Sequence, residues 1–121
     1  MYMHHCSIEE ELVAHQLRKT RDRHEMLRLF EAPRTWSASQ INRELTGDLS
    51  TVYRNLQTLV DQAILRTVHS YDGEAHYERT NRPHHDHLAC AQCETLACIP
   101  CPVPTVGEHR LELLGLCSTC Q

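Results

Sequence analysis

The strongest constraint on the fold of this chain is a set of four cysteines arranged as two Cys-x-x-Cys pairs. Cys90 and Cys93 form the first pair, and Cys117 and Cys120 form the second. Each pair offers two thiolates from one tight turn, and two such turns supply the four ligands of a tetrahedral zinc site. The sequence therefore predicts a structural zinc ion that joins the two turns.

The length of the chain makes such a metal useful. A chain of 121 residues forms one domain or two very small ones, and small domains bury little apolar surface. The seven cysteines also suit a disulfide framework in a secreted protein, but the N-terminus lacks the apolar stretch of a secretion signal. There is no apolar run of about 18 residues for a membrane span. We therefore expect a cytoplasmic protein with metal-bound cysteines and no membrane partner.

Helix-start signals divide the first half of the chain into four predicted helices. Capping residues at Ser7, Thr20, Ser37 and Ser50 each precede a run with apolar residues at helical spacing. The last of these runs ends near Gln62. Residues 64–69 and 75–78 then read as two strands joined by a turn that contains an Asp-Gly pair. Helices followed by such a hairpin predict a winged helix-turn-helix.

In a winged helix-turn-helix, the second helix of the turn enters the DNA major groove with its N-terminal residues toward the base edges. We expect the DNA contacts from this helix to be Ser50, Thr51, Tyr53, Arg54 and Asn55. The alternative is that Tyr53 is half-buried and Arg54 is a solvated surface charge, because small helical modules with a hairpin also serve as protein adaptors.

The distribution of charged residues is compatible with DNA binding but does not by itself indicate it. Residues 1–66 carry nine Lys and Arg against nine Asp and Glu, whereas residues 67–121 carry three against seven. Five basic residues fall within eleven positions of the first half and form a local basic face: Arg18, Lys19, Arg21, Arg23 and Arg28. We add Arg18 and Lys19 to the candidate DNA contacts.

Three motifs together resemble the ferric uptake regulator family of bacterial metal-responsive transcription factors. They are residues 49–56 (LSTVYRNL), 84–93 (HHDHLACAQC) and 115–120 (GLCSTC), and the resemblance runs from about Thr20 to Cys120. It implies an α+β fold: a winged-helix DNA-binding domain, residues 1–80, and a small α/β dimerisation domain, residues 81–121. It also implies a homodimeric repressor of metal homeostasis genes that binds AT-rich inverted repeats in double-stranded DNA when a regulatory metal is loaded.

The resemblance assigns roles to individual residues of this chain. The four paired cysteines match the family's structural zinc ligands. Glu78, His85 and His87 match ligands of the sensing site, whereas His84, Asp86 and His109 match an auxiliary site. Alternation along one extended strand allows this, because successive side chains point to opposite faces.

One ligand of the family's sensing site is missing here. The family usually draws it from the hinge after the second helix, often as a histidine, but Arg34-Thr35-Trp36 occupies that place. We expect a substitute from the wing or from the N-terminal arm. The candidates are His69, His76, Cys6, His4 and His5.

The segment between Cys93 and Cys117 is about a dozen residues shorter than the family's, and three prolines within five residues exclude a helix there. The helix that normally covers the dimer sheet is therefore expected to be absent, along with its acidic ligand, which leaves the auxiliary site incomplete. We expect Cys98 and Cys101 to pack a shortened turn; a redox switch or an additional metal clamp is the alternative.

The sensed metal follows only from the ligand types. Two imidazoles and a carboxylate suit Zn, Fe(II) and Mn(II), and the thiol-rich composition favours Zn and a zinc uptake regulator-like member with a shortened dimerisation domain. A redox- or peroxide-responsive regulator of the same family is an alternative. Outside the family, the alternatives are a zinc-ribbon adaptor and a deaminase-like enzyme, since His76-x-Glu78 and Cys90-x-x-Cys93 echo the zinc deaminase motifs. We expect no enzymatic activity.

Overall fold

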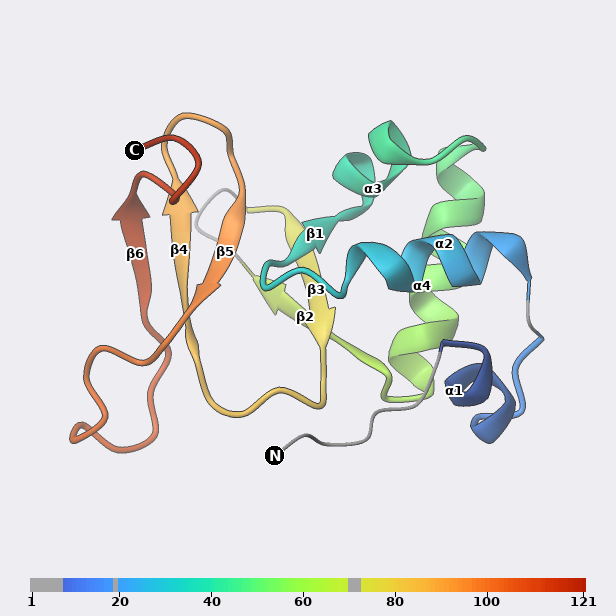
Figure 1. Ribbon diagram of the computed structural model, residues 1–121, viewed down its shortest axis with the longest axis horizontal. Helices are drawn as coiled ribbons and strands as arrows, with labels where there is room; N and C mark the ends of the chain where they lie inside the picture. The colour runs from blue at the N-terminus through green and yellow to red at the C-terminus, as the bar shows by residue number, and fades with distance from the viewer. Residues whose placement is uncertain (1–7, 19, 70–72) are drawn as a thin grey trace.

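The computed structural model describes residues 8–18, 20–69 and 73–121. Within these ranges the chain begins with helices, namely α1 (Ile8–Ala14), α2 (Arg21–Leu29), α3 (Ala38–Glu44) and α4 (Leu49–Asp61). The strands are β1 (Trp36–Ser37), β2 (Leu65–His69), β3 (Ala75–Arg79), β4 (Asp86–Cys90), β5 (Leu96–Ile99) and β6 (Glu112–Gly115). Figure 1 shows the helices on one side of the molecule and the β5-β4-β6 sheet on the other, which agrees with the predicted α+β class.

Side-chain caps fix where the helices begin. The Thr20 hydroxyl accepts the backbone N–H of Arg23 at 3.2 Å, and Ser37 forms a reciprocal capping box with Gln40. Both starts are as predicted. The fourth helix begins earlier than predicted, because Asp48 rather than Ser50 is its cap and accepts the N–H of Thr51 at 2.9 Å. The predicted cap at Ser7 lies outside the described residues.

One hydrophobic core holds the helices against the hairpin. Its buried members all precede residue 66: Leu12, Met26, Leu27, Phe30, Trp36, Ala38, Ile41, Val52, Leu56, Leu59, Ile64 and Leu65. Each fully buried large apolar side chain contributes roughly 1.5–3 kcal/mol through loss of water contact. The first part of the chain therefore has a core of its own.

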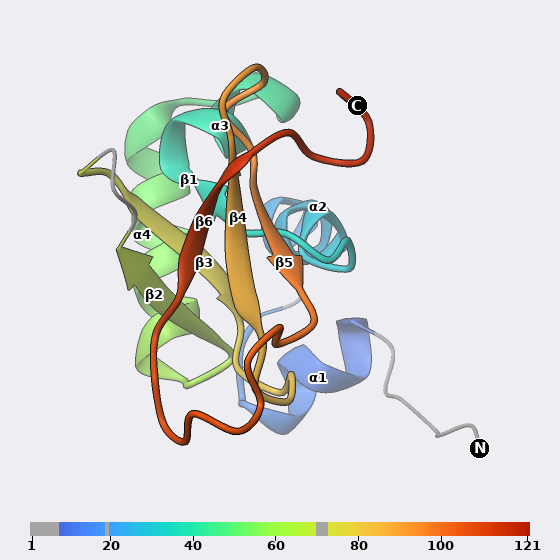
Figure 2. The same ribbon diagram turned by 90° about the vertical axis from the view of Figure 1, so that its left-hand side faces the viewer.

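Two three-stranded sheets follow one another along the chain. The first has the order β1-β3-β2 and is antiparallel throughout, and the second has the order β5-β4-β6 with β6 parallel to β4. Figure 2 shows β6 at one edge of the second sheet. Only Ala89, Cys90, Leu96 and Cys117 are buried apolar residues there, and no helix occurs in residues 73–121. A sheet with so small an apolar core needs an additional source of stability, such as a bound metal or a partner subunit.

The hinge after α2 joins the two parts by backbone hydrogen bonds. The Thr35 N–H donates to the Leu96 carbonyl at 2.8 Å, and the Cys98 N–H donates to the Pro33 carbonyl at 2.9 Å. Between these two bonds, Arg34 forms an isolated bridge with Ala97. The hinge thus runs antiparallel to β5 and continues the second sheet toward the helices. None of the described helices has the length and apolar character to cross a membrane.

Candidate metal centres and DNA-binding helix

The four predicted zinc ligands lie together at one end of the second sheet. Cys90 ends β4, Cys93 lies in the turn after it, and Cys117 and Cys120 lie in the turn after β6. Their sulfurs all lie within 4.8 Å of one another, and the Sγ atoms of Cys93 and Cys117 are 3.7 Å apart. A tetrahedral site with zinc–sulfur bonds of about 2.3 Å places its sulfurs about 3.8 Å apart. This four-cysteine cluster therefore fits zinc.

The electrostatics of the four-cysteine cluster also favour a cation. Backbone N–H groups of Cys117 and Cys93 lower the pKa of Cys90 to about 6. The adjacent sulfur of Cys117, together with burial, raises the pKa of Cys120 to about 12. The Cys90 thiol therefore loses its proton readily, whereas the neighbouring sulfurs oppose deprotonation of Cys120. A divalent cation removes that opposition, because it stabilises every thiolate bound to it.

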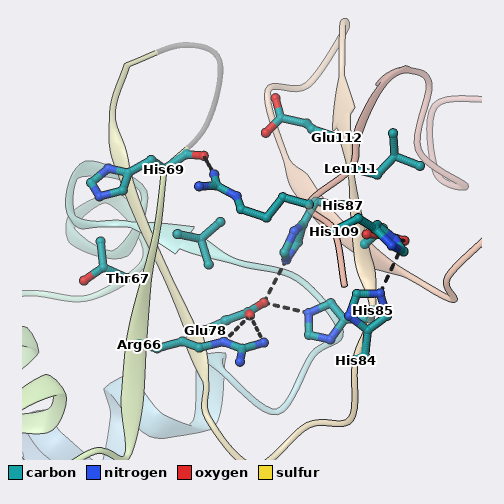
Figure 3. Close-up of a pocket in the computed structure, with 13 residues that line it drawn as sticks. Arg66, Thr67, His69, Glu78, His84, His85, His87, His109, Leu111 and Glu112 are labelled. Carbon is teal, nitrogen blue, oxygen red and sulfur yellow. Dashed lines mark hydrogen bonds and ion pairs between the residues drawn. The ribbon is translucent and has the colours of Figure 1, made fainter. Parts of the chain in front are cut away.

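A second cluster, called the junction cluster here, consists of Glu78, His85, His87 and Cys98, whose ligand atoms lie within 4.8 Å of one another. Glu78 comes from β3 in the first sheet, whereas the others lie on or just before β4 and β5. Both His85 Nε2 and His87 Nε2 contact Glu78 Oε1, at 2.8 and 2.9 Å. Figure 3 shows this carboxylate between the two rings and Arg66.

Glu78 is prepared to act as an anionic ligand. The residue is 1% exposed, and burial alone would raise its pKa, but hydrogen bonds from His87, His85 and Arg66 hold the pKa well below its ordinary value. Arg66 Nε donates to Oε2 at 2.6 Å, which leaves Oε1 directed at the histidines. His85 Nδ1 in turn bonds the Pro83 carbonyl at 2.9 Å, and this arrangement leaves Nε2 as the metal-binding nitrogen.

Cys98 lies as a fourth donor beside Glu78, His85 and His87, where the sequence analysis expected a residue of the wing or the N-terminal arm. Its Sγ lies 3.6 Å from Glu78 Oε1, and in the β4–β5 pairing Cys98 stands directly opposite His87. Directly opposed residues in a sheet point to the same face. This position is the one that the alternative of an additional metal clamp requires, and it is set by the register of a hairpin centred on the Cys90–Cys93 turn.

The wing histidines proposed as substitute ligands lie outside the junction cluster. His76 is buried, and its Nδ1 lies 3.1 Å from the hydroxyl of Thr35. His69 lines a cleft of about 590 Å³ between the wing and the second sheet, where its carbonyl accepts a bond from Arg110 at 2.8 Å. Cys6, His4 and His5 lie outside the described residues.

A third cluster, called the outer cluster here, lies on the other face of β4. It consists of His84, Asp86, Cys101 and His109, with ligand atoms within 4.8 Å of one another. His109 Nε2 is 3.1 Å from Asp86 Oδ2 and 3.5 Å from Cys101 Sγ. The predicted alternation of the residues along β4 is confirmed. Cys101 lies with the three predicted residues, so a fourth donor is present where the family's helix is lacking.

The predicted DNA-contact residues are not equally accessible. Tyr53 is 54% exposed, Ser50 and Arg54 are exposed, and Thr51 is partly buried. Asn55 is instead buried, and its Oδ1 accepts a bond from Arg23 Nε at 3.2 Å. Asn55 therefore faces α2 rather than the outer surface of α4.

Arg18, in the segment just before the N-terminus of α2, is also accessible. Its side chain is exposed, and its carbonyl accepts a bond from Arg23 Nη1 at 3.2 Å. Lys19 lies outside the described residues. The accessible candidates thus lie on the N-terminal turns of α4 and in the segment before α2.

The sequence of this chain is similar to that of one known protein family. Residues 14–102 match the ferric uptake regulator family. The chain belongs to this family. Among its relatives, the ferric uptake regulation protein of Neisseria meningitidis is 30% identical over 87% of each chain. The zinc uptake regulation protein of Mycobacterium tuberculosis is 31% identical over 79% of this chain and 73% of its own length.

Solved structures agree with the family assignment. The Vibrio cholerae ferric uptake regulator, 26% identical, superposes with a TM-score of 0.71 over 90% of this chain and 98% of its own. A zinc-bound manganese uptake regulator, 24% identical, has the same fold with a TM-score of 0.78 over 93% of this chain and 99% of its own. Ferric uptake regulator family members are metal-responsive transcriptional regulators and not enzymes, which removes the deaminase interpretation.

Proposed function

We propose that this family member is a zinc-responsive, DNA-binding repressor of metal homeostasis genes. The observation that carries the proposal is the position of Glu78. It lies on β3, directly after the helical part, yet its carboxylate contacts two histidines of the other sheet at 2.8 and 2.9 Å. A metal held by these residues is bound by both parts of the chain at once, so its binding selects one arrangement of the two parts.

The residues of the junction cluster perform distinct tasks in this mechanism. Arg66 holds one carboxylate oxygen of Glu78, and the hydrogen bond from His85 to Pro83 sets the orientation of that imidazole. His87 and Cys98 project side by side from paired strands. A bound divalent cation would supply one common point of attachment for all four side chains. The Vibrio cholerae ferric uptake regulator is described as showing a structural rearrangement of its DNA-binding domains, which supports a mobile arrangement as the controlled variable.

Zinc is the metal that the junction cluster favours. One thiolate, two imidazoles and one carboxylate oxygen make a four-coordinate set that suits zinc, whereas Fe(II) and Mn(II) favour shells of nitrogen and oxygen. The histidines and Glu78 alone suit all three metals, and the thiol of Cys98 favours zinc among them. Fe(II) and Mn(II) remain the competing metals, and the relatives include regulators named for iron and for zinc.

The DNA partner and the dimer complete the proposal. Residues 1–80 form a winged-helix domain whose α4 enters the major groove of an AT-rich inverted repeat, and residues 81–121 form the shortened dimerisation domain. A two-fold repeat requires a homodimer. Support for the interface comes from β6, whose outer edge pairs with no strand among the described residues. Leu113 and Leu114 in β6 and Leu116 just after it are between 40% and 67% exposed. Zinc in the four-cysteine cluster stabilises this domain.

A redox- or peroxide-responsive regulator is the second candidate, and the junction cluster argues against it. Burial and the negative charge of Glu78 raise the pKa of Cys98 to about 11. A thiol with so high a pKa forms little of the thiolate that reacts with peroxides. The zinc-ribbon adaptor is disfavoured because residues 14–102 match a family of transcriptional regulators.

The test compares two neighbouring histidines that belong to different clusters. His85→Ala removes a ligand of the junction cluster, and His84→Ala removes one of the outer cluster. We expect zinc to tighten DNA binding of the native chain and of His84→Ala by a factor of about 5 to 150, and to leave His85→Ala unchanged. Fluorescence anisotropy at fixed salt measures these affinities. An intact zinc response in folded His85→Ala would contradict the proposal.

A further inference from the structure

Arg82 occupies a distinctive position between the metal site and the helices. It lies in the segment between β3 and β4 and is partly buried. Its Nη1 donates to the Sγ of Cys98 at 3.4 Å, and its Nη2 donates to the carbonyls of Phe30 and Ala32, each at 2.7 Å. One guanidinium therefore joins a junction-cluster ligand to the C-terminal end of α2.

The end of α2 is a suitable anchor for a cation. The last carbonyls of a helix have no intrahelical partner, and the helix dipole places partial negative charge there. Phe30 is the C-cap of α2, and its side chain is fully buried in the core. The planar fork of the guanidinium can therefore hold these carbonyls and the sulfur in one fixed relation.

Helix α2 is connected to α4, the proposed DNA-binding helix, by core packing and by a hydrogen bond. Met26 and Leu27 pack in the same core as the buried face of α4. At the other end of α2, Arg23 Nε bonds Asn55 Oδ1 at 3.2 Å, and Asn55 lies on α4 two residues after the exposed Tyr53. A displacement of α2 therefore changes the position of the α4 surface that would face DNA.

We propose that Arg82 is the positioning residue that couples the junction cluster to α2 and, through it, to α4. The inference rests on the proposed function and adds the route by which that site regulates DNA binding. When its sulfur is held in the loaded site, Cys98 can no longer change rotamer, so the guanidinium that donates to it is held too. The carbonyls of Phe30 and Ala32 are then fixed relative to the second sheet.

The Cys98 backbone contact alone does not explain the coupling. The bond from the Cys98 N–H to the Pro33 carbonyl involves no side chain, so it forms whether or not the sulfur binds a metal. Arg82 differs because it contacts the sulfur itself. Coupling energy can also spread over many residues, so the proposal requires a direct measurement of coupling rather than of affinity alone.

The experiment uses the full chain with zinc in the four-cysteine cluster and with the outer cluster disabled by Cys101→Ser and His109→Ala, so that Co(II) reports only on the junction cluster. In this background it compares Arg82→Gln, Arg82→Lys and Arg110→Gln. Arg110 is a matched control, because it also joins the two parts, through the His69 carbonyl, but it bonds no junction-cluster ligand. Three quantities are measured: zinc affinity, the sulfur-to-metal charge-transfer absorption of Co(II) in the junction cluster, and DNA affinity with and without saturating zinc.

We expect Arg82→Gln to keep the charge-transfer band and to lose at most the 10- to 100-fold in zinc affinity typical of outer-shell changes. At saturating zinc, its ratio of loaded to unloaded DNA affinity should fall from about 5 to 150 toward one. Arg82→Lys keeps the charge at the helix end but lacks the fork, so it should lose part of the ratio. Arg110→Gln should keep it.

The outcomes separate the two proposals. If the native chain responds to zinc and folded Arg82→Gln or Arg82→Lys keeps the full ratio at saturating zinc, the role of Arg82 is refuted. A variant that binds zinc more weakly but keeps the ratio shows an outer-shell role only, which also refutes coupling. If the native chain itself shows no zinc response, the proposed function fails and this inference fails with it.

Discussion

Replacing Cys98 by serine tests whether the junction cluster contains a thiolate ligand. The change preserves the size of the side chain and removes the sulfur that lies 3.6 Å from Glu78 Oε1. The outer cluster is first disabled by Cys101→Ser and His109→Ala, so that one regulatory site remains. The four-cysteine cluster stays loaded with zinc in every sample.

The expected size of the effect follows from binding linkage. Zinc at 100 times its dissociation constant stabilises the folded state by about 2.7 kcal/mol. An unfolding entropy of about 2.1 cal/mol/K per residue amounts to about 0.25 kcal/mol/K for a chain of 121 residues, so the Tm rises by about 11 °C. Loss of a ligand should cost at least the 100-fold at the upper end for outer-shell partners. The same zinc concentration then adds only about 0.4 kcal/mol, or about 2 °C.

Thermal unfolding followed by circular dichroism, with free zinc set by a chelator buffer, measures these shifts. The parent with a disabled outer cluster should show the large shift, and the variant that also carries Cys98→Ser should show the small one. The two proteins should melt at similar temperatures without regulatory zinc, since Cys98 lies outside the hydrophobic core. An equal zinc-induced shift in both would refute the assignment of Cys98 as a ligand.

Three further predictions concern the remaining features of the chain. Cys117→Ser should release zinc and loosen the second sheet; retention of one tightly held zinc by mass spectrometry, with unchanged melting, would exclude the four-cysteine assignment. Tyr53→Ala should weaken specific DNA binding more than non-specific binding, and an equal loss in anisotropy titrations would mean that Tyr53 does not read bases. Ala63 follows α4 with a φ of 60°, so Ala63→Gly should raise the free energy of unfolding by about 1 kcal/mol in urea titrations, and a decrease would contradict this origin of strain.

The helical part was predictable because its signals are local. The Thr20 cap and the Ser37 capping box act over three residues, and the apolar spacing of α4 is continuous. The start of α4 was misplaced because Ser50 was taken as its first capping residue, although the carboxylate of Asp48 is an equally good cap and also complements the helix dipole. Asn55 was placed among the DNA contacts because it lies near the N-terminus of this helix, whereas its bond to Arg23 depends on packing between helices.

The metal sites were predictable only where their ligands are close in sequence. Residues 84–87 alternate between two clusters as the period of a strand requires. For Cys98 and Cys101 the sequence left turn packing and a metal clamp open, because their places depend on the pairing of β5 with β4, whereas the three prolines indicate only that a helix is absent. Had residues 96–99 been paired with 86–89, the register would have set Cys98 opposite His87. The contacts of Arg82 join three separate segments, and no local pattern predicts them.

The most direct test of the central claim is a zinc titration of DNA binding by the native chain. The protein carries zinc only in the four-cysteine cluster at the start, and the probe is fluorescent DNA from the gene's own upstream region at fixed salt. We expect zinc to raise the DNA affinity by a factor of about 5 to 150, and Fe(II) and Mn(II) to do so less at equal free concentration. DNA binding that is tight but indifferent to all three metals would contradict the proposed function.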